Sequence, residues 1–112
     1  MEFKSIFILC LVFASSLSSP FTKELNRTVA ATDVDLSCPA YGQDCIFNDI
    51  ERAYDSGTWQ ECAYQCNQHR TCVFWSWRTQ DSAINPYGCW LKSACPLILA
   101  DPALISGHFD CY

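Results

Sequence analysis

Cysteine is the residue type with the widest chemical scope in this chain, which has nine cysteines among its 112 residues. Thiols at this density could form disulfides, bind a metal ion or carry out redox exchange. Each chemistry requires its own spacing and compartment, so the sequence can separate them. All but one of the cysteines lie after residue 37, at Cys38, Cys45, Cys62, Cys66, Cys72, Cys89, Cys95 and Cys111.

Metal and redox chemistry find little support in the spacing. Cys62, Cys66, His69 and Cys72 lie close together, but structural zinc sites usually combine a short cysteine knuckle with a second knuckle farther along the chain. A thiol–disulfide oxidoreductase would need a Cys-x-x-Cys pair, and the sequence has none. We therefore expect no metal site and no cofactor.

Hydrolytic chemistry is poorly supported as well. It requires a nucleophile, a base and a group that orients the base, and the only histidines are His69 and His108. Neither lies in a recognisable catalytic motif, and the four glycines form no phosphate-binding loop. We expect no catalytic residue, and the protein is predicted not to be an enzyme.

Residues 1–18 are predicted to be a secretory signal peptide. Lys4 precedes an apolar run from Ile6 to Ala14, and small serine residues follow. The run is shorter than the roughly 18 residues that a membrane anchor requires, so we expect a secreted, extracellular protein without a membrane span. Cys10 leaves with the signal peptide, and the remaining even set of cysteines enters an oxidising compartment that favours disulfides.

Residues 19–37 are predicted to be a polar N-terminal arm, and residues 38–112 a single small domain. In the arm, Val34 and Leu36 could begin a strand, and Asn26-Arg27-Thr28 makes Asn26 an acceptor for N-glycosylation. The chain has a net charge of −5 and no basic stripe, so we expect no nucleic-acid partner.

A helix is predicted from Trp59 to about Gln68. Thr58 and Glu61 have the spacing of a capping box, in which the Thr58 hydroxyl accepts the Glu61 amide proton and the Glu61 carboxylate reaches back to the Thr58 amide. The helical repeat turns one stripe of side chains toward the core. Its members are Trp59, Cys62, Ala63 and Cys66.

An aromatic strand, Thr71–Arg78, is predicted after the helix. Period two places Val73, Trp75 and Trp77 on one face, where the two tryptophans indicate a core layer. The other face carries Cys72, Phe74, Ser76 and Arg78.

Two more strands are predicted nearer the C-terminus. Residues 80–86 are typical of a loop, and a strand is expected at Tyr87–Lys92. A last strand, after a turn at Ser106-Gly107, is expected within Ile105–Cys111. A few short strands around one helix indicate the α+β class.

Taken in order, these motifs resemble the PAN/apple domain. The resemblance covers Cys38 to Cys111 and implies a curved antiparallel sheet of about five strands that cradles one α-helix. It rests on Cys62-x3-Cys66-x5-Cys72, the aromatic strand, Cys89-Trp-Leu91-Lys92, and Ser106-Gly107 before the last cysteine.

The resemblance also implies a disulfide pairing. Two bridges would hold the helix, Cys62–Cys89 and Cys66–Cys72, and a third would join the first and last cysteines, Cys38–Cys111. This leaves Cys45–Cys95, which exceeds the basic family pattern. The exchanged pairing, Cys45–Cys111 with Cys38–Cys95, therefore stays open.

Apple-like modules bind proteins or carbohydrates, so the resemblance implies a secreted, non-catalytic module that recognises an extracellular protein or glycan, in adhesion or as a lectin. Aromatic and arginine side chains dominate interface energetics. The expected contact residues are therefore Arg70, Arg78, Tyr87, Trp90 and Lys92. Trp90 could equally belong to the core, and Lys92 could form local bonds only.

Other classes of function stay open. A small, disulfide-rich, secreted chain could be a toxin, effector or defence peptide that blocks a protein target, although such peptides are often basic and this chain is acidic. A structural role in a matrix or secretion is a third alternative. The sequence indicates neither the ligand nor the oligomeric state.

Replacing Cys66 by alanine is predicted to impair folding, because one disulfide contributes about 2 to 4 kcal/mol to a domain stability of about 5 to 15 kcal/mol. The measurements are secreted yield, resistance to proteolysis and thermal unfolding. A normal yield with an unchanged melting curve would contradict a disulfide framework.

Overall fold

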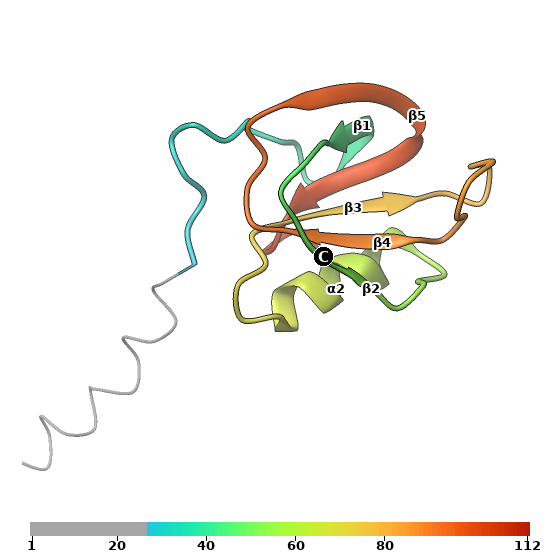
Figure 1. Cartoon of the computed structure of the whole chain (residues 1–112), viewed down its shortest axis with the longest axis horizontal. Coiled ribbons are helices and arrows are strands. Elements are labelled where there is room, and N and C mark those ends of the chain that lie inside the picture. The colour runs from blue at the N-terminus through green and yellow to red at the C-terminus, as the bar shows by residue number, and fades with distance from the viewer. Residues whose placement is uncertain (1–26) are drawn as a thin grey trace, which may run out of the picture.

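The structure, a computed structural model, describes residues 27–112 of the chain. The predicted signal peptide, the first part of the predicted arm and Asn26 lie outside these residues. The described part has the expected α+β fold, a five-stranded antiparallel sheet with one helix packed on it (Figure 1). Within this range, no helix has the length and apolar character needed to cross a membrane.

The sheet has the strand order β1-β5-β3-β4-β2, so β3 lies at its centre and β1 and β2 form its edges. All neighbouring strands are antiparallel. In chain order, the elements are β1 (Ala40–Cys45), β2 (Asp49–Ala53), α2 (Trp59–Gln68), β3 (Phe74–Arg78), β4 (Cys89–Lys92) and β5 (Ile98–His108).

The two edge strands are consecutive in the chain, and only residues 46–48 connect them. A flat sheet of this order would separate its edges by about 19 Å, at about 4.8 Å for each strand spacing. The chain from Cys45 to Asp49 spans at most about 14 Å. The sheet therefore has to curl until the end of β1 meets the start of β2, and the long strand β5 bends with it (Figure 1).

Helix α2 has the predicted bounds, but its N-terminal cap differs from the prediction in one contact. The Thr58 hydroxyl accepts the Glu61 amide proton (3.3 Å) as expected. The Glu61 carboxylate accepts the amide proton of Gly57 (2.9 Å) rather than that of Thr58. The shift by one residue keeps the carboxylate folded back over the start of the helix, which is how a capping box stabilises it.

The inward stripe of α2 is confirmed, since Cys62, Ala63 and Cys66 are completely buried. Trp59 completes the stripe and stacks on Trp75 of β3, with the ring centroids 5.7 Å apart. One hydrophobic cluster therefore fills the space between the helix and one face of the sheet.

A second cluster lies on the opposite face and joins the chain before β1 to the sheet. Its buried members are Leu36, Ala40, Cys45, Val73, Phe74 and Cys95. Val34 and Leu36 belong to no strand, although the Val34 amide donates to the Cys95 carbonyl (2.7 Å). Arg27 donates to the carbonyls of Cys66 (3.1 Å) and His69 (2.6 Å). Residues 27–37 thus pack along the domain.

Four disulfides fasten these layers: Cys38–Cys111, Cys45–Cys95, Cys62–Cys89 and Cys66–Cys72. They are the pairs that the resemblance implies, and the exchanged pairing does not occur. So many bridges in one small domain are consistent with an extracellular protein.

Strand β3 begins later than predicted, at Phe74 rather than Thr71. The Cys66–Cys72 bridge holds the preceding residues against the end of α2, so regular alternation begins only after it. Val73 consequently packs with Phe74 in the second cluster and not beside Trp75, where the period-two pattern placed it.

Strand β4 also begins later, at Cys89, because Tyr87 has a φ of 66° in the preceding turn. Strand β5 spans Ile98–His108 and contains Ser106-Gly107, so the predicted turn at these residues is wrong. Gly107 serves close packing instead, since a Cβ at this position would lie 2.7 Å from the indole of Trp75.

Gly107→Ala is therefore predicted to destabilise the domain by about 1 to 3 kcal/mol, the usual cost of overpacking a core. The matched control is Gly57→Ala, whose added methyl group would meet only the Glu61 carboxylate, at 3.9 Å. Thermal or denaturant unfolding of both variants tests this. Equal stability of the two variants would show that the Trp75 ring yields without cost.

Candidate functional site

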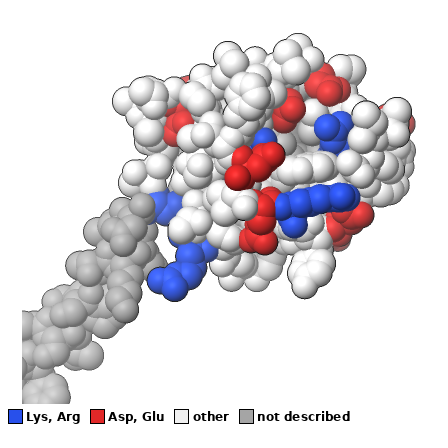
Figure 2. All heavy atoms as spheres, in the orientation of Figure 1, with Lys and Arg blue, Asp and Glu red and all other residues white. Residues whose placement is uncertain are grey.

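Charged side chains of both signs are interspersed on the face of the domain seen in Figure 2. Strand β2 is bordered by three polar pairs, one of them between a carboxylate and a histidine, and two of the three join the strand to neighbouring elements. They are Asp49 with Lys92 (2.6 Å), Glu51 with His69 (2.7 Å) and Arg52 with Asp55 (2.8 Å). Hollows lie on both sides of this strand.

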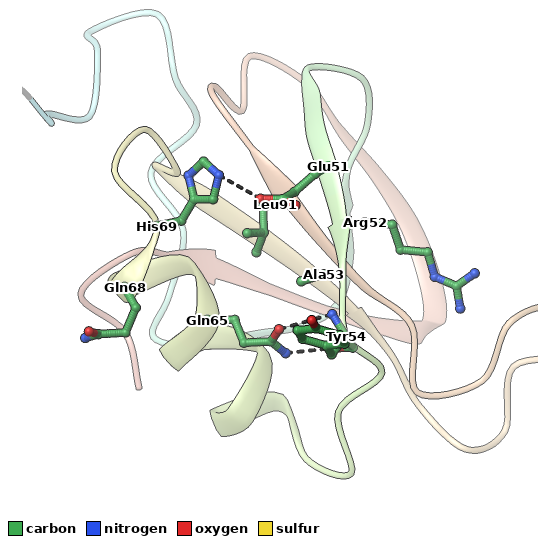
Figure 3. A pocket seen from close by; sticks show the side chains of 8 residues that line it. All are labelled: Glu51, Arg52, Ala53, Tyr54, Gln65, Gln68, His69 and Leu91. Carbon is green, nitrogen blue, oxygen red and sulfur yellow. Dashed lines mark hydrogen bonds and ion pairs between the residues drawn. The ribbon is translucent and has the colours of Figure 1, made fainter.

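The hollow between β2 and α2 has a volume of about 610 Å³ and a floor that includes Leu91. Gln65 closes one end, because its side-chain amide accepts the Tyr54 amide proton (3.1 Å) and donates to the Tyr54 carbonyl (3.0 Å). His69 reaches Glu51 at the other end, while Arg52 points away from the hollow (Figure 3). The helix thus binds the outer edge of β2 through side chains.

Of the two described histidines, only His69 lies beside both a carboxylate and a hydroxyl group. Its Nε2 lies 2.7 Å from Glu51, and Nδ1 lies 3.4 Å from the Thr71 hydroxyl. The Thr71 amide, however, donates to the same Nδ1 at 3.2 Å. Because that hydrogen bond occupies the lone pair of Nδ1, this nitrogen cannot act as a base toward the Thr71 hydroxyl. Among the described residues, no group of three or more metal-ligating side chains lies together.

A groove of about 170 Å³ lies on the other side, inside the curl and on the sheet face opposite α2. It contains three of the five predicted contact residues, Arg78, Trp90 and Lys92. The alternation of β3 and β4 places them on this face, because their neighbours Trp77 and Leu91 face the helix. The complete lining is Asp44, Ile46, Phe47, Asp49, Ser76, Arg78, Trp90, Lys92 and Leu104.

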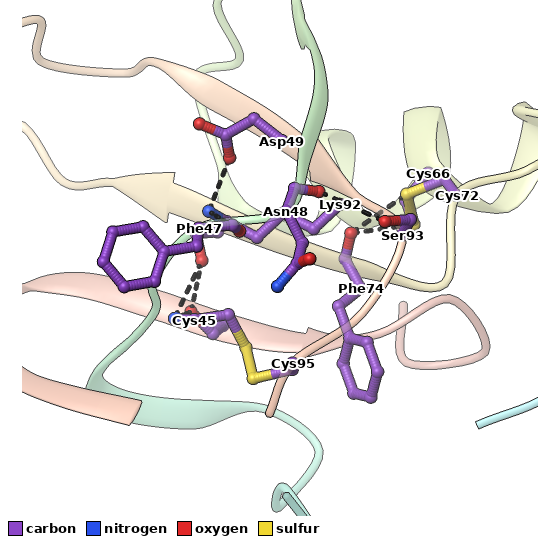
Figure 4. A network of polar contacts seen from close by, with 12 residues as sticks. Cys45, Phe47, Asn48, Asp49, Cys66, Cys72, Phe74, Lys92, Ser93 and Cys95 are labelled. Atoms are coloured by element: carbon purple, nitrogen blue, oxygen red, sulfur yellow. Dashed lines mark hydrogen bonds and ion pairs between the residues drawn. A yellow bond between two sulfur atoms is a disulfide. The ribbon is translucent and has the colours of Figure 1, made fainter. Parts of the chain in front are cut away.

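Lys92 has a structural role in this groove. Its side chain is buried, with 4 % of the residue exposed. Its ammonium group donates to the Asp49 carboxylate (2.6 Å) and to the Phe47 carbonyl (3.3 Å) (Figure 4). Its charge is therefore already paired within the domain, where it positions the link before β2. That Lys92 also contacts a ligand stays a prediction.

The link between β1 and β2 has an unusual backbone at the lip of the groove. Phe47 and Asn48 have φ values of 66° and 60°, a left-handed conformation that costs a bulky residue about 1 to 2 kcal/mol. Lys92 binds the Phe47 carbonyl, and the Ser93 amide donates to the Asn48 carbonyl (3.0 Å) (Figure 4). Phe47 itself is 71 % exposed.

Two arginines lie against Trp90 beside this lip. The guanidinium carbons of Arg52 and Arg78 are each 5.2 Å from the centroid of the Trp90 ring. Gly88 leaves room for the ring, since a Cβ there would approach it to 2.4 Å. Cation–π contacts of this kind contribute about 0.5 to 1 kcal/mol at exposed sites. Trp90, half-buried, thus orders both guanidinium groups.

Buried serines join β1 to the floor of the groove. The hydroxyls of Ser76 and Ser106 lie 2.7 Å apart, and Ser106 donates to the Gln43 carbonyl (2.8 Å). The Cys45 amide donates to Ser76 (3.3 Å), next to the Cys45–Cys95 bridge. These contacts hold the curled end of β1 over the sheet.

The other two predicted contact residues lie outside the groove. Arg70 is exposed in the segment between α2 and β3. Tyr87 precedes β4, where its ring lies 6.3 Å from that of Trp77 and its hydroxyl donates to Gln80 (3.3 Å). The structure therefore brings Arg78 and Trp90 together in the groove and leaves Arg70 and Tyr87 apart from it.

Sequence reasoning missed Phe47, Asp49 and Arg52. The pair Asn48-Asp49 is typical of a turn, which could have indicated a link at this point. Nothing in the local sequence shows that Phe47 lies in water, because exposure there depends on strands paired across the whole domain.

A scan against protein-family models found no match to this chain, and a search of the curated proteins found none. Assignment to the PAN/apple family therefore remains a proposal that rests on the motifs and on the fold.

The Lys92–Asp49 pair predicts an asymmetry between two variants. Asp49→Ala leaves a buried ammonium with one carbonyl partner, which should cost about 2 to 3 kcal/mol, whereas Lys92→Met leaves a half-exposed carboxylate that water can solvate, at about 1 kcal/mol. Denaturant unfolding compares them. A larger loss for Lys92→Met would mean that the ammonium contributes more through its hydrogen bond to the Phe47 carbonyl than through its pair with Asp49.

Proposed function

We propose that the protein is a secreted, non-catalytic binding module of the PAN/apple type, which recognises an extracellular protein or glycan through the curled face of its sheet. The contact surface consists of Phe47, Arg52, Arg78 and Trp90. The observation that carries the proposal is the position of Phe47, an aromatic side chain held in water at the lip of a groove by a costly backbone conformation.

Phe47 contributes little stabilising energy to the fold that would offset the cost of its left-handed backbone conformation. Most of its ring is exposed, so it buries little apolar surface, and asparagine or glycine would adopt the same φ with less strain. Strained residues of this kind persist where surrounding contacts hold them, and they gather at functional sites. Here Lys92 and Ser93 supply the holding contacts.

The size and chemistry of the groove favour one group of a larger partner. Its volume of about 170 Å³ is below the roughly 300 to 1,000 Å³ of small-molecule sites. One sugar ring or one side chain suits this space better than a cofactor. In the groove, Arg78 can donate hydrogen bonds, Asp44 can accept them, and the aromatic rings provide apolar contact. Arg52 lies beside the groove, against Trp90, and is a further donor.

A glycan array and a panel of extracellular protein and cell surfaces, probed with the disulfide-bonded protein, test the proposal. Saturable binding to either panel is expected. Blocking of a channel or protease without such binding would favour the toxin or effector alternative. A wild-type protein that binds neither panel would contradict the proposal.

Phe47→Asn is predicted to separate binding from folding. Because asparagine tolerates the left-handed conformation, the variant should be at least as stable as the wild type. Its affinity for the ligand found above should fall at least about tenfold, as for an interface hot spot. Tyr41→Asn, which changes an exposed aromatic residue outside the groove, is the matched control. A less stable Phe47→Asn with unchanged affinity would assign Phe47 to the fold.

A further inference from the structure

A second aromatic surface lies between α2 and the loop before it, away from the curled face. Tyr54, Tyr64 and Tyr112 are 88 %, 52 % and 59 % exposed. They line one hollow of about 580 Å³, and we call it the tyrosine surface. Its other lining residues are Asp55, Ser56, Gln60, Glu61 and Gln65.

The rings of these three tyrosines contribute little to the hydrophobic core. Tyr64 and Tyr112 meet edge to face, with centroids 6.0 Å apart, and both remain more than half in water. Tyr54 is the most exposed large hydrophobic residue of the described chain. Its hydrogen bonds are made by its main chain, to the side chains of Gln65 and Ser56. A cluster of exposed aromatic rings around one hollow is typical of an interaction surface.

The electrostatics of the tyrosine surface favour a cation. The hollow is lined by two carboxylates and by no lysine or arginine. Arg52 pairs with one of them, Asp55 (2.8 Å), whereas Glu61 accepts only the neutral amide of Gly57. Tyrosine rings present a negative face that adds to this field.

We propose that the tyrosine surface binds an arginine or lysine side chain presented by an extended segment of a protein partner. The cation would lie against the rings of Tyr64 and Tyr112 and near the Glu61 carboxylate. The hollow is within the size range of ligand sites and exceeds one side chain, so it has room for flanking backbone, to which Gln60 can bond. This surface is separate from the groove, because α2 and the groove lie on opposite faces of the sheet.

The test is a titration of the full disulfide-bonded domain with a synthetic peptide of alternating arginine and glycine, followed by NMR and calorimetry. The matched control peptide carries glutamate in place of arginine. Shifts are expected around Tyr54, Glu61 and Tyr64, with affinity falling as salt is raised. The glutamate peptide should not bind.

Two variants separate the aromatic and ionic contributions. Tyr64→Ala and Glu61→Gln should each weaken peptide binding about three- to fivefold, given the usual strength of cation–π and exposed ionic contacts. Glutamine keeps the capping acceptor, so α2 should retain its helicity and melting temperature. Tyr41→Ala, on the distant edge strand β1, and Phe47→Asn should bind the peptide like the wild type.

Three results would overturn the proposal. One is a shift map outside the tyrosine surface, and another is equal binding of the glutamate peptide. The third is binding of a neutral glycan at this surface that Glu61→Gln leaves unchanged. None of these results depends on binding in the groove, so the proposal for the groove and the proposal for the tyrosine surface can be disproved independently.

Discussion

The short connection between the two edge strands is the constraint on which the rest of this structure depends. Strands β1 and β2 lie at opposite edges of the sheet, yet residues 46–48 alone join them. A flat sheet cannot satisfy that link, so the sheet curls, and the curl creates the groove. The contacts that hold it are the Cys45–Cys95 bridge, the buried Ser76–Ser106 pair and the ammonium of Lys92.

The two faces of the sheet consequently differ in how they are covered. On one face, α2 and two disulfides close a buried aromatic core around Trp75. On the other face, the core is smaller, and part of the sheet stays open to the groove. Trp90 belongs to this second face, which resolves whether it is core or surface. It is half-buried, and it orders two arginines rather than filling the interior.

Lys92 shows how a motif residue can support the fold through its charge. Its buried charge would be costly without partners, and Asp49 with the Phe47 carbonyl provides them. The same contacts hold the strained link that exposes Phe47. The Lys92 ammonium therefore stabilises both the curled sheet and the link that carries Phe47. The proposed binding surface depends on these contacts. The tyrosine surface lies apart from these contacts, between α2, the loop before it and the C-terminal residue Tyr112.

The sequence by itself determined the elements whose signals are local. The bounds of α2 follow from the Thr58 cap and an apolar stripe, and the aromatic pattern of β3 follows from period two, because both depend on neighbours within a few residues. Only the tertiary structure decided the rest. β2 is exposed along most of its length and shows no alternation, so nothing local predicts it. Whether Gly107 turns the chain or admits the Trp75 ring, and whether Phe47 lies in water, depends on residues brought together from distant parts of the chain.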